Sequence, residues 1–94
     1  MAASLPPDAE PVGQSPEFTQ DSVPDALLTE HQTAAGRWAL LEVLAGALSF
    51  VDLVDHESRR VDTGQSVVIE PERPHKVSVQ GAVRFRLSFF KEAP

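Results

Sequence analysis

The sequence predicts a small all-β domain, either a sandwich or a barrel. Short runs of branched and aromatic residues recur at intervals of roughly eight to twelve residues, with glycine and proline turns between them. The chain has 94 residues and no cysteine, so no disulfide or thiolate metal site can support its small core. Closure into a barrel would remove the exposed sheet edges of such a domain.

The first residues are expected to differ from the rest. Residues 1–15 predict a flexible or extended acidic arm, and residues 16–94 predict the folded domain. Prolines are dense up to Pro16, and few large apolar residues accompany them, a composition that resists regular structure. No Lys or Arg precedes residue 31, whereas six acids do, which favours a solvated tail over a docking segment.

The next segments alternate between candidate strands and turns. Residues 26–31 put Leu27, Thr29 and His31 on one face if they are extended, and residues 32–36 read as a turn. Residues 37–53 have the Ala, Leu and Glu content of a helix. Gly46 in the middle of this segment and the β-like order of the residues after it favour a strand instead.

The second half of the chain predicts four shorter elements. Residues 54–64 predict a hairpin loop, a short strand and a turn at Gly64, and residues 66–70 predict a strand that ends at a proline-rich turn. In residues 75–79, His75 and two valines share one face. Residues 83–90 alternate strictly, with one side formed by Val83, Phe85, Leu87 and Phe89, and the other by Arg84, Arg86 and Ser88.

Charge and hydropathy exclude two classes of partner. The net charge is −6, and the eight bases are matched by eight acids after residue 30, so no basic face is available for nucleic acid. The apolar run 39–51 contains Glu42 and falls short of the roughly 20 residues that cross a bilayer. Residues 1–7 lack the pattern of a secretory signal. We expect a cytoplasmic protein with neither a nucleic acid nor a membrane partner.

Two of the three histidines are candidate metal ligands. His75 follows a proline that restricts the backbone, and strand parity turns it toward an apolar face. His31 ends an earlier candidate strand. Together they would form half of a site for Zn, Fe, Ni or Mn, because neutral imidazole binds divalent metals. The alternative is a hydrogen-bonded wall residue, since their separation carries no ligand-spacing signal. His56, in a polar loop, is expected to be exposed.

The remaining pocket candidates are Trp38 and Arg86. Trp38 follows the turn after His31 and is expected to line the same pocket, whereas Arg86 lies on the polar side of the last strand. A surface role for Arg86 is favoured over a clamp on an anionic ligand. Glu42 should face away from the core if its neighbours point inward. No phosphate loop, nucleophile elbow or paired-histidine helix is present, so no catalytic residue is assigned.

Three segments, 18–50, 69–79 and 85–90, resemble the cupin-like family of the amino-terminal domain of tellurite-resistance protein B, a methyltransferase, and its stand-alone bacterial relatives. The matching positions are Val23, Pro24, Leu27, Leu28, His31, Thr33, Gly36, Trp38, Leu41, Val43, Leu44, Gly46, Pro71, His75, Phe85, Leu87 and Phe89. The resemblance implies a small jelly-roll β-barrel of the cupin type. Two positions depart from the family: Ala34 replaces a lysine, and Pro74 replaces a tryptophan.

The resemblance also implies a function. Ala39 stands where catalytic cupins carry a glutamate, so the full set of three histidines and one glutamate is not present. We therefore expect a small-molecule or metal-binding protein, without demonstrable catalysis, that is linked to tellurite, toxic-anion or stress responses. Two alternatives stay open: a metal-dependent dioxygenase or isomerase that uses His31 and His75, and a dimerising interaction module. A homodimer is expected in any case, because short chains gain stability by association.

Overall fold

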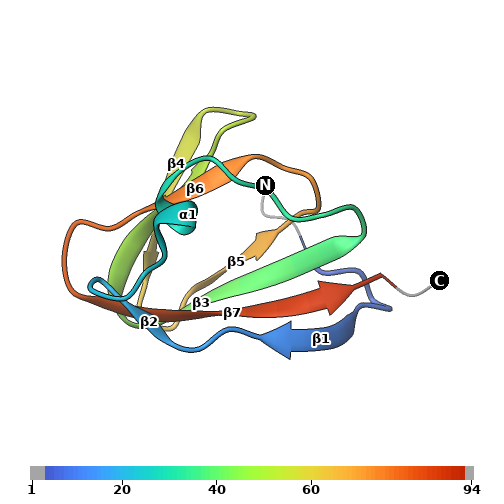
Figure 1. Cartoon of the computed structure of the whole chain (residues 1–94), viewed down its shortest axis with the longest axis horizontal. Helices are drawn as coiled ribbons and strands as arrows, with labels where there is room; N and C mark the ends of the chain where they lie inside the picture. Colours follow the sequence, from blue (N-terminus) through green and yellow to red (C-terminus); the bar gives the residue numbers. More distant parts are fainter. Residues whose placement is uncertain (1–3, 93–94) are drawn as a thin grey trace.

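The all-β prediction is confirmed by a computed structural model, which describes residues 4–92. The described residues form one network of seven antiparallel strands and one short helix (Figure 1). The elements are β1 (Glu10–Gln14), β2 (Phe18–Thr19), α1 (Asp25–Leu28), β3 (Arg37–Asp52), β4 (Glu57–Asp62), β5 (Ser66–Ile69), β6 (His75–Ser78) and β7 (Val83–Lys91). No helix within these residues is long and apolar enough to cross a membrane.

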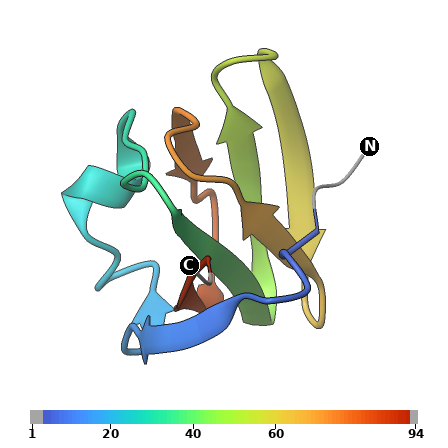
Figure 2. The same cartoon turned by 90° about the vertical axis from the view of Figure 1, so that its right-hand side faces the viewer.

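Strand β3 organises the fold, and the helix alternative for residues 37–53 is wrong. The first half of β3 pairs with β5 and β7, and its second half pairs with β4 and β6 (Figure 2). The change takes place at a bulge next to Gly46, whose φ is +79°. A Cβ at this position would overlap the carbonyl oxygen of Ala82, so only glycine fits. This bend lets one strand supply both halves of the sheet.

The core lies between the two halves of the sheet. It consists of buried residues from five strands: Ala39, Leu41, Val43, Leu48, Val61, Val67, Ile69, Val77, Val83, Phe85 and Leu87. The predicted alternation of β7 is confirmed, because its odd-numbered residues face this core. Phe85 is fully buried, and its ring centroid lies 5.7 Å from that of Phe18.

The sheet is not closed into a barrel. Among the described residues, β4 and β5 each pair only with β3, so their outer edges remain unpaired. The expected closure is therefore absent at this seam. Within residues 4–92, a turn at Gly64 connects β4 to β5, and no further strand pairs with their outer edges.

Two segments differ from their expected local structure. Residues 10–14, which lie in the expected arm, form β1 along the edge of β7, although all their side chains are exposed. The side chain of Gln14 donates to Ser88, and Lys91 lies 3.6 Å from Glu10. Residues 25–28 form α1, although 26–28 belong to the segment 26–31 that was expected to be extended. Asp25 in its first turn suits the positive end of the helix dipole, and α1 packs beside β6.

Candidate functional site

The structure brings His31 and His75 together. His75 pairs with Asp52 of β3 on one side of β6 and with His31 on the other. The two histidines exchange backbone hydrogen bonds, each N–H donating to the other's carbonyl oxygen at 3.0 Å. Paired residues on neighbouring strands project to the same face. Their ring centroids accordingly lie 4.1 Å apart, with the rings edge to face.

Both imidazoles are held in the same tautomer. The Nδ1 atom of His31 lies 2.9 Å from the carbonyl oxygen of Thr29, and that of His75 lies 2.8 Å from the carbonyl oxygen of Arg73. A carbonyl oxygen can only accept, so each Nδ1 carries the proton and each Nε2 keeps its lone pair. Histidines that bind metals usually have this arrangement, because a second hydrogen bond orients the ring.

His75 is neutral near pH 7. It is the buried polar residue of the core, with 3% of its surface exposed. Burial is the largest effect and lowers the pKa of His75 below its ordinary value of 6.5. The hydrogen bond to the Arg73 carbonyl, the next largest effect, raises this pKa, while the nearby His31 lowers it and Asp52 raises it. The ring also stacks on Phe50, with centroids 5.2 Å apart. The lone pair on its Nε2 is therefore available at physiological pH.

The stability of the metal-free protein is expected to fall as the pH drops below about 6.5, the ordinary pKa of histidine. Because the pKa of His75 is lowered in the folded state, the unfolded chain takes up a proton that the folded chain excludes. The contribution of the neutral His75 to folding stability is complete above pH 6.5, and it is lost as the pH falls through the pKa that His75 has in the folded protein. Urea unfolding between about pH 7.5 and pH 5, with a chelator present, measures it.

The matched variants for this measurement are His75→Gln and His56→Gln. His75→Gln should lower stability at all pH values and remove the decline that begins near pH 6.5. His56 lies in an exposed turn with φ +57°, and its replacement should leave the decline in place. If the decline survives His75→Gln, this histidine is not its source.

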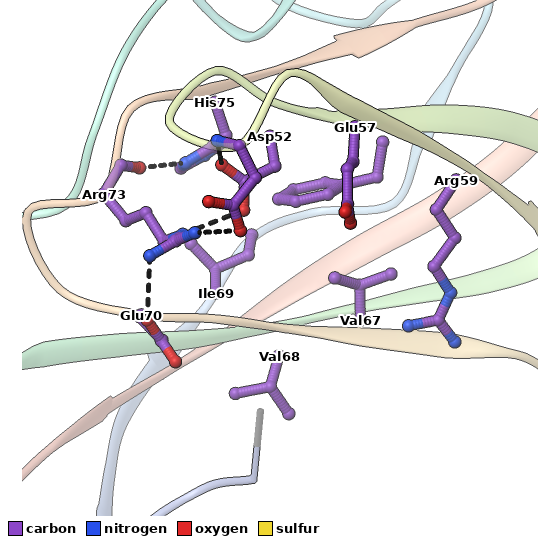
Figure 3. Close-up of a pocket in the computed structure, with 11 residues that line it drawn as sticks. Asp52, Glu57, Arg59, Val67, Val68, Ile69, Glu70, Arg73 and His75 are labelled. Atoms are coloured by element: carbon purple, nitrogen blue, oxygen red, sulfur yellow. Dashed lines mark hydrogen bonds and ion pairs between the residues drawn. The ribbon is translucent and has the colours of Figure 1, made fainter. Parts of the chain in front are cut away.

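A pocket of about 500 Å³ lies beside His75, at the open seam between β4 and β5. This volume falls within the range of small-molecule sites. Val67 and Ile69 of β5 and Phe50 of β3 supply apolar surface (Figure 3). The other lining residues are Asp52, Asp55, Glu57, Arg59, Val68, Glu70, Arg73 and His75. His31 is not among them, so it reaches the pocket only through its neighbour His75.

Arg73 holds the mouth of this pocket together. Its Nε lies 2.8 Å from Asp52 and its Nη2 lies 2.8 Å from Asp55, while Nη1 lies 3.8 Å from Glu70. Asp52 also accepts hydrogen bonds from the backbone N–H groups of Val54 and Asp55. Burial alone would raise the pKa of Asp52, but Arg73 and the backbone donors outweigh it and lower that pKa. Arg73 thus ties the turn after β3 to the loop before β6.

The structure does not bring Trp38 or Arg86 to the histidines. Both lie on the outer face of the sheet, because their odd-numbered neighbours on β3 and β7 fill the core. The indole Nε1 of Trp38 donates to Glu92 at 2.7 Å, and Nε of Arg86 lies 3.4 Å from Glu42. Neither residue lines the pocket. The outward orientation predicted for Glu42 is confirmed.

Several residues of the site were not predicted, namely Asp52, Glu57, Arg59 and Arg73. Alternation along the strands gives a partial signal for the first three, because Phe50 and Asp52 share one face of β3. The β3–β4 register places Arg59 opposite Phe50 and Glu57 opposite Asp52, so all four residues lie on the same face. No sequence signal identifies Arg73 as the centre of a carboxylate cluster. Within residues 4–92, no three His, Asp or Glu side chains are grouped so as to hold a metal ion.

Comparison with known proteins identifies similar domains. The family model described as the TehB-like domain matches residues 13–87. The probable S-adenosyl-L-methionine-dependent methyltransferase TehB of Haemophilus influenzae is 32% identical over 69 residues, which are 68% of this chain and 24% of the methyltransferase. The chain thus spans about a quarter of the length of that relative.

Solved structures share the fold. A protein from Escherichia coli K12 superposes with a TM-score of 0.87 at 19% identity, covering 98% of this chain and 99% of its own. TehB from Haemophilus influenzae superposes with a TM-score of 0.81 at 24% identity, covering 92% of this chain and 32% of its own. Protein NMB1881 from Neisseria meningitidis gives a TM-score of 0.64 at 12% identity, covering 96% and 89%. The same fold thus occurs both alone and within a longer protein.

Proposed function

Since the chain belongs to the TehB-like domain family, we propose that it is a small-molecule-binding module whose histidine pair also accepts a divalent metal ion. It acts in tellurite or related stress responses, in keeping with the resemblance of its sequence to tellurite-resistance proteins. It performs no catalysis of its own, and the methyl transfer named for its relative is not extended to this domain.

The observation that carries the proposal is the shared geometry of the two imidazoles. Each Nδ1 is committed to a backbone carbonyl oxygen, so both lone pairs lie on the Nε2 atoms of rings 4.1 Å apart. His75 also lines a pocket that is large enough for a small ligand. Metal and organic ligand could therefore occupy neighbouring positions.

The donor set fits a weakly held ion better than a catalytic centre. Catalytic zinc sites usually have three protein ligands, and structural ones have four. Here two imidazoles supply the ligands for Zn, Fe, Ni or Mn, and the other positions are left to water or to a small molecule. The carboxylate of Asp52, the residue that pairs with His75 on β3, is already bound by Arg73 and two backbone N–H groups. These facts support binding over the dioxygenase or isomerase alternative.

A Zn²⁺ titration of the chelator-treated protein tests the proposal. His31→Ala is the informative variant, because His31 is only partly buried and its loss should not unfold the domain. We expect it to weaken Zn²⁺ binding by about 10-fold or more, as the loss of one ligand from a two-histidine site requires. Isothermal titration calorimetry measures the affinity, and circular dichroism checks the fold.

The third histidine provides the control. His56→Ala removes an exposed imidazole from the turn between β3 and β4, and it should leave the Zn²⁺ affinity unchanged. Equal affinities of the wild type and His31→Ala would overturn the metal part of the proposal. The same holds if His56→Ala abolishes binding.

A further inference from the structure

The pocket contains two charged side chains that form no ion pair with another described residue of the protein. Arg73 directs all three of its guanidinium nitrogens to carboxylates, so its positive charge is already compensated within the protein. Glu57 and Arg59, by contrast, form no ion pair with another described residue, although both line the pocket. These two groups are therefore free to bind a ligand.

Strand geometry directs both side chains into the pocket. They lie two residues apart on β4, on the face that also carries the fully buried Val61. Figure 3 shows the Glu57 carboxylate pointing toward Val67 and the Arg59 side chain reaching down beside Val67. Alternate residues of a strand are about 6.5–7 Å apart. The negative charge of Glu57 and the positive charge of Arg59 thus lie next to each other, close to the apolar side chain of Val67.

The formal charge of the pocket disfavours an anion. Its lining contains four carboxylates, on Asp52, Asp55, Glu57 and Glu70, against two guanidinium groups, on Arg59 and Arg73. With His75 left out, these charges sum to −2. An inorganic oxyanion would meet net repulsion and an Arg73 that is already occupied. A ligand with a positive group next to Glu57 avoids both problems.

We propose that the pocket binds a small aliphatic zwitterion, with its ammonium group on Glu57, its carboxylate on Arg59 and its carbon chain over Phe50, Val67 and Ile69. This inference rests on the proposed small-molecule function and specifies its ligand class. A spacer of a few methylene groups matches the separation of adjacent same-face side chains on β4. The negative pocket then tolerates a simple ammonium ion better than a simple carboxylate.

Four probes of equal chain length test the ligand class: 4-aminobutyrate, butylammonium, butanol and butyrate. Each is titrated into the chelator-treated full chain, and the backbone amide shifts of Phe50, Ile69 and Ser88 are followed by NMR. The first two residues line the pocket, and Ser88 does not. We expect 4-aminobutyrate to bind best, then butylammonium, with butyrate last.

Two exposed substitutions separate the two charged contacts. Glu57→Gln should weaken 4-aminobutyrate and butylammonium by about two- to fivefold, the effect of one exposed ion pair, and leave butanol unchanged. Arg59→Gln should weaken 4-aminobutyrate by a similar factor and leave butylammonium as tight or tighter. Both side chains are exposed, so neither change should disturb folding.

The possible outcomes distinguish this inference from the proposed function. If butyrate binds as well as 4-aminobutyrate, the zwitterion inference is overturned while a small-molecule pocket stands. The same conclusion follows if both variants bind the four probes like the wild type. If none of the probes shifts the amides of Phe50 and Ile69, the inference fails together with the small-molecule part of the proposed function.

Discussion

Replacing Gly46 with alanine is expected to destabilise the domain by about 2–5 kcal/mol. Two effects add at this position. Its φ of +79° lies in the left-handed region, which costs a side-chain-bearing residue roughly 1–2 kcal/mol. The new Cβ would also overlap the carbonyl oxygen of Ala82, and this backbone group can move only if the β3–β7 pairing shifts. Urea unfolding followed by tryptophan fluorescence measures the loss.

Gly64→Ala is the matched control. Gly64 has a φ of +84°, but a Cβ there would meet no atom within 4 Å. It should therefore cost only the backbone term, about 1–2 kcal/mol. Equal losses for the two variants would contradict the role of the close approach between Gly46 and Ala82. In that case β3 could bend without a glycine at its centre.

The Gly46 variant should also affect the site. The residues of β3 that follow the bend include Phe50 and Asp52, which line the pocket and pair with β6. A shift of this half-strand would displace His75 relative to His31, since β6, which carries His75, pairs with β3 on one side and with His31 on the other. We therefore expect weaker Zn²⁺ binding in Gly46→Ala, even under conditions where it remains folded.

Phe85→Ala is expected to cost about 3–5 kcal/mol, the usual range for removal of a buried aromatic ring. Phe85 has 0% of its surface exposed, and Phe18 is its aromatic neighbour. Because small domains are stable by only about 5–15 kcal/mol, we expect a large fraction of the Phe85→Ala molecules to be unfolded at moderate temperature. Thermal and urea unfolding at neutral pH measure the change.

Phe90→Ala provides the comparison on the same strand. Phe90 faces the outer side of β7, where it pairs with Trp38 and is only partly buried. Its removal should cost roughly 1–2 kcal/mol, because less apolar area returns to water. If the two variants lose similar stability, the assignment of the core to the odd-numbered face of β7 is wrong.

The elements that the sequence predicted well are those that bury one face of a strand. In β7, every second residue from Val83 to Phe89 faces the core, and burial with a period of two leaves a direct trace in the sequence. For β3, Gly46 together with the residues after it favoured a strand over a helix. The structure explains this signal, because Gly46 is the point at which β3 bends.

The elements that were missed leave no such trace. Strand β1 exposes all its side chains and is held by backbone pairing with β7, so its hydropathy resembles that of a tail. Helix α1 spans four residues, too few for a helical period to emerge. A helix this short depends on tertiary packing, here beside β6.

For the site, the sequence by itself singled out His31 and His75, from the proline before His75, from strand parity and from the chemistry of imidazole, and the family resemblance includes both positions. Only the tertiary structure decided which of these side chains meet. Trp38 follows His31 closely in sequence, yet strand parity sends it to the opposite face. Arg73 contacts three carboxylates because strand register and the loop before β6 bring distant segments together. The same arrangement leaves Glu57 and Arg59 in the pocket without an ion pair to another described residue. Those pairings depend on contacts across the sheet, which local sequence does not encode.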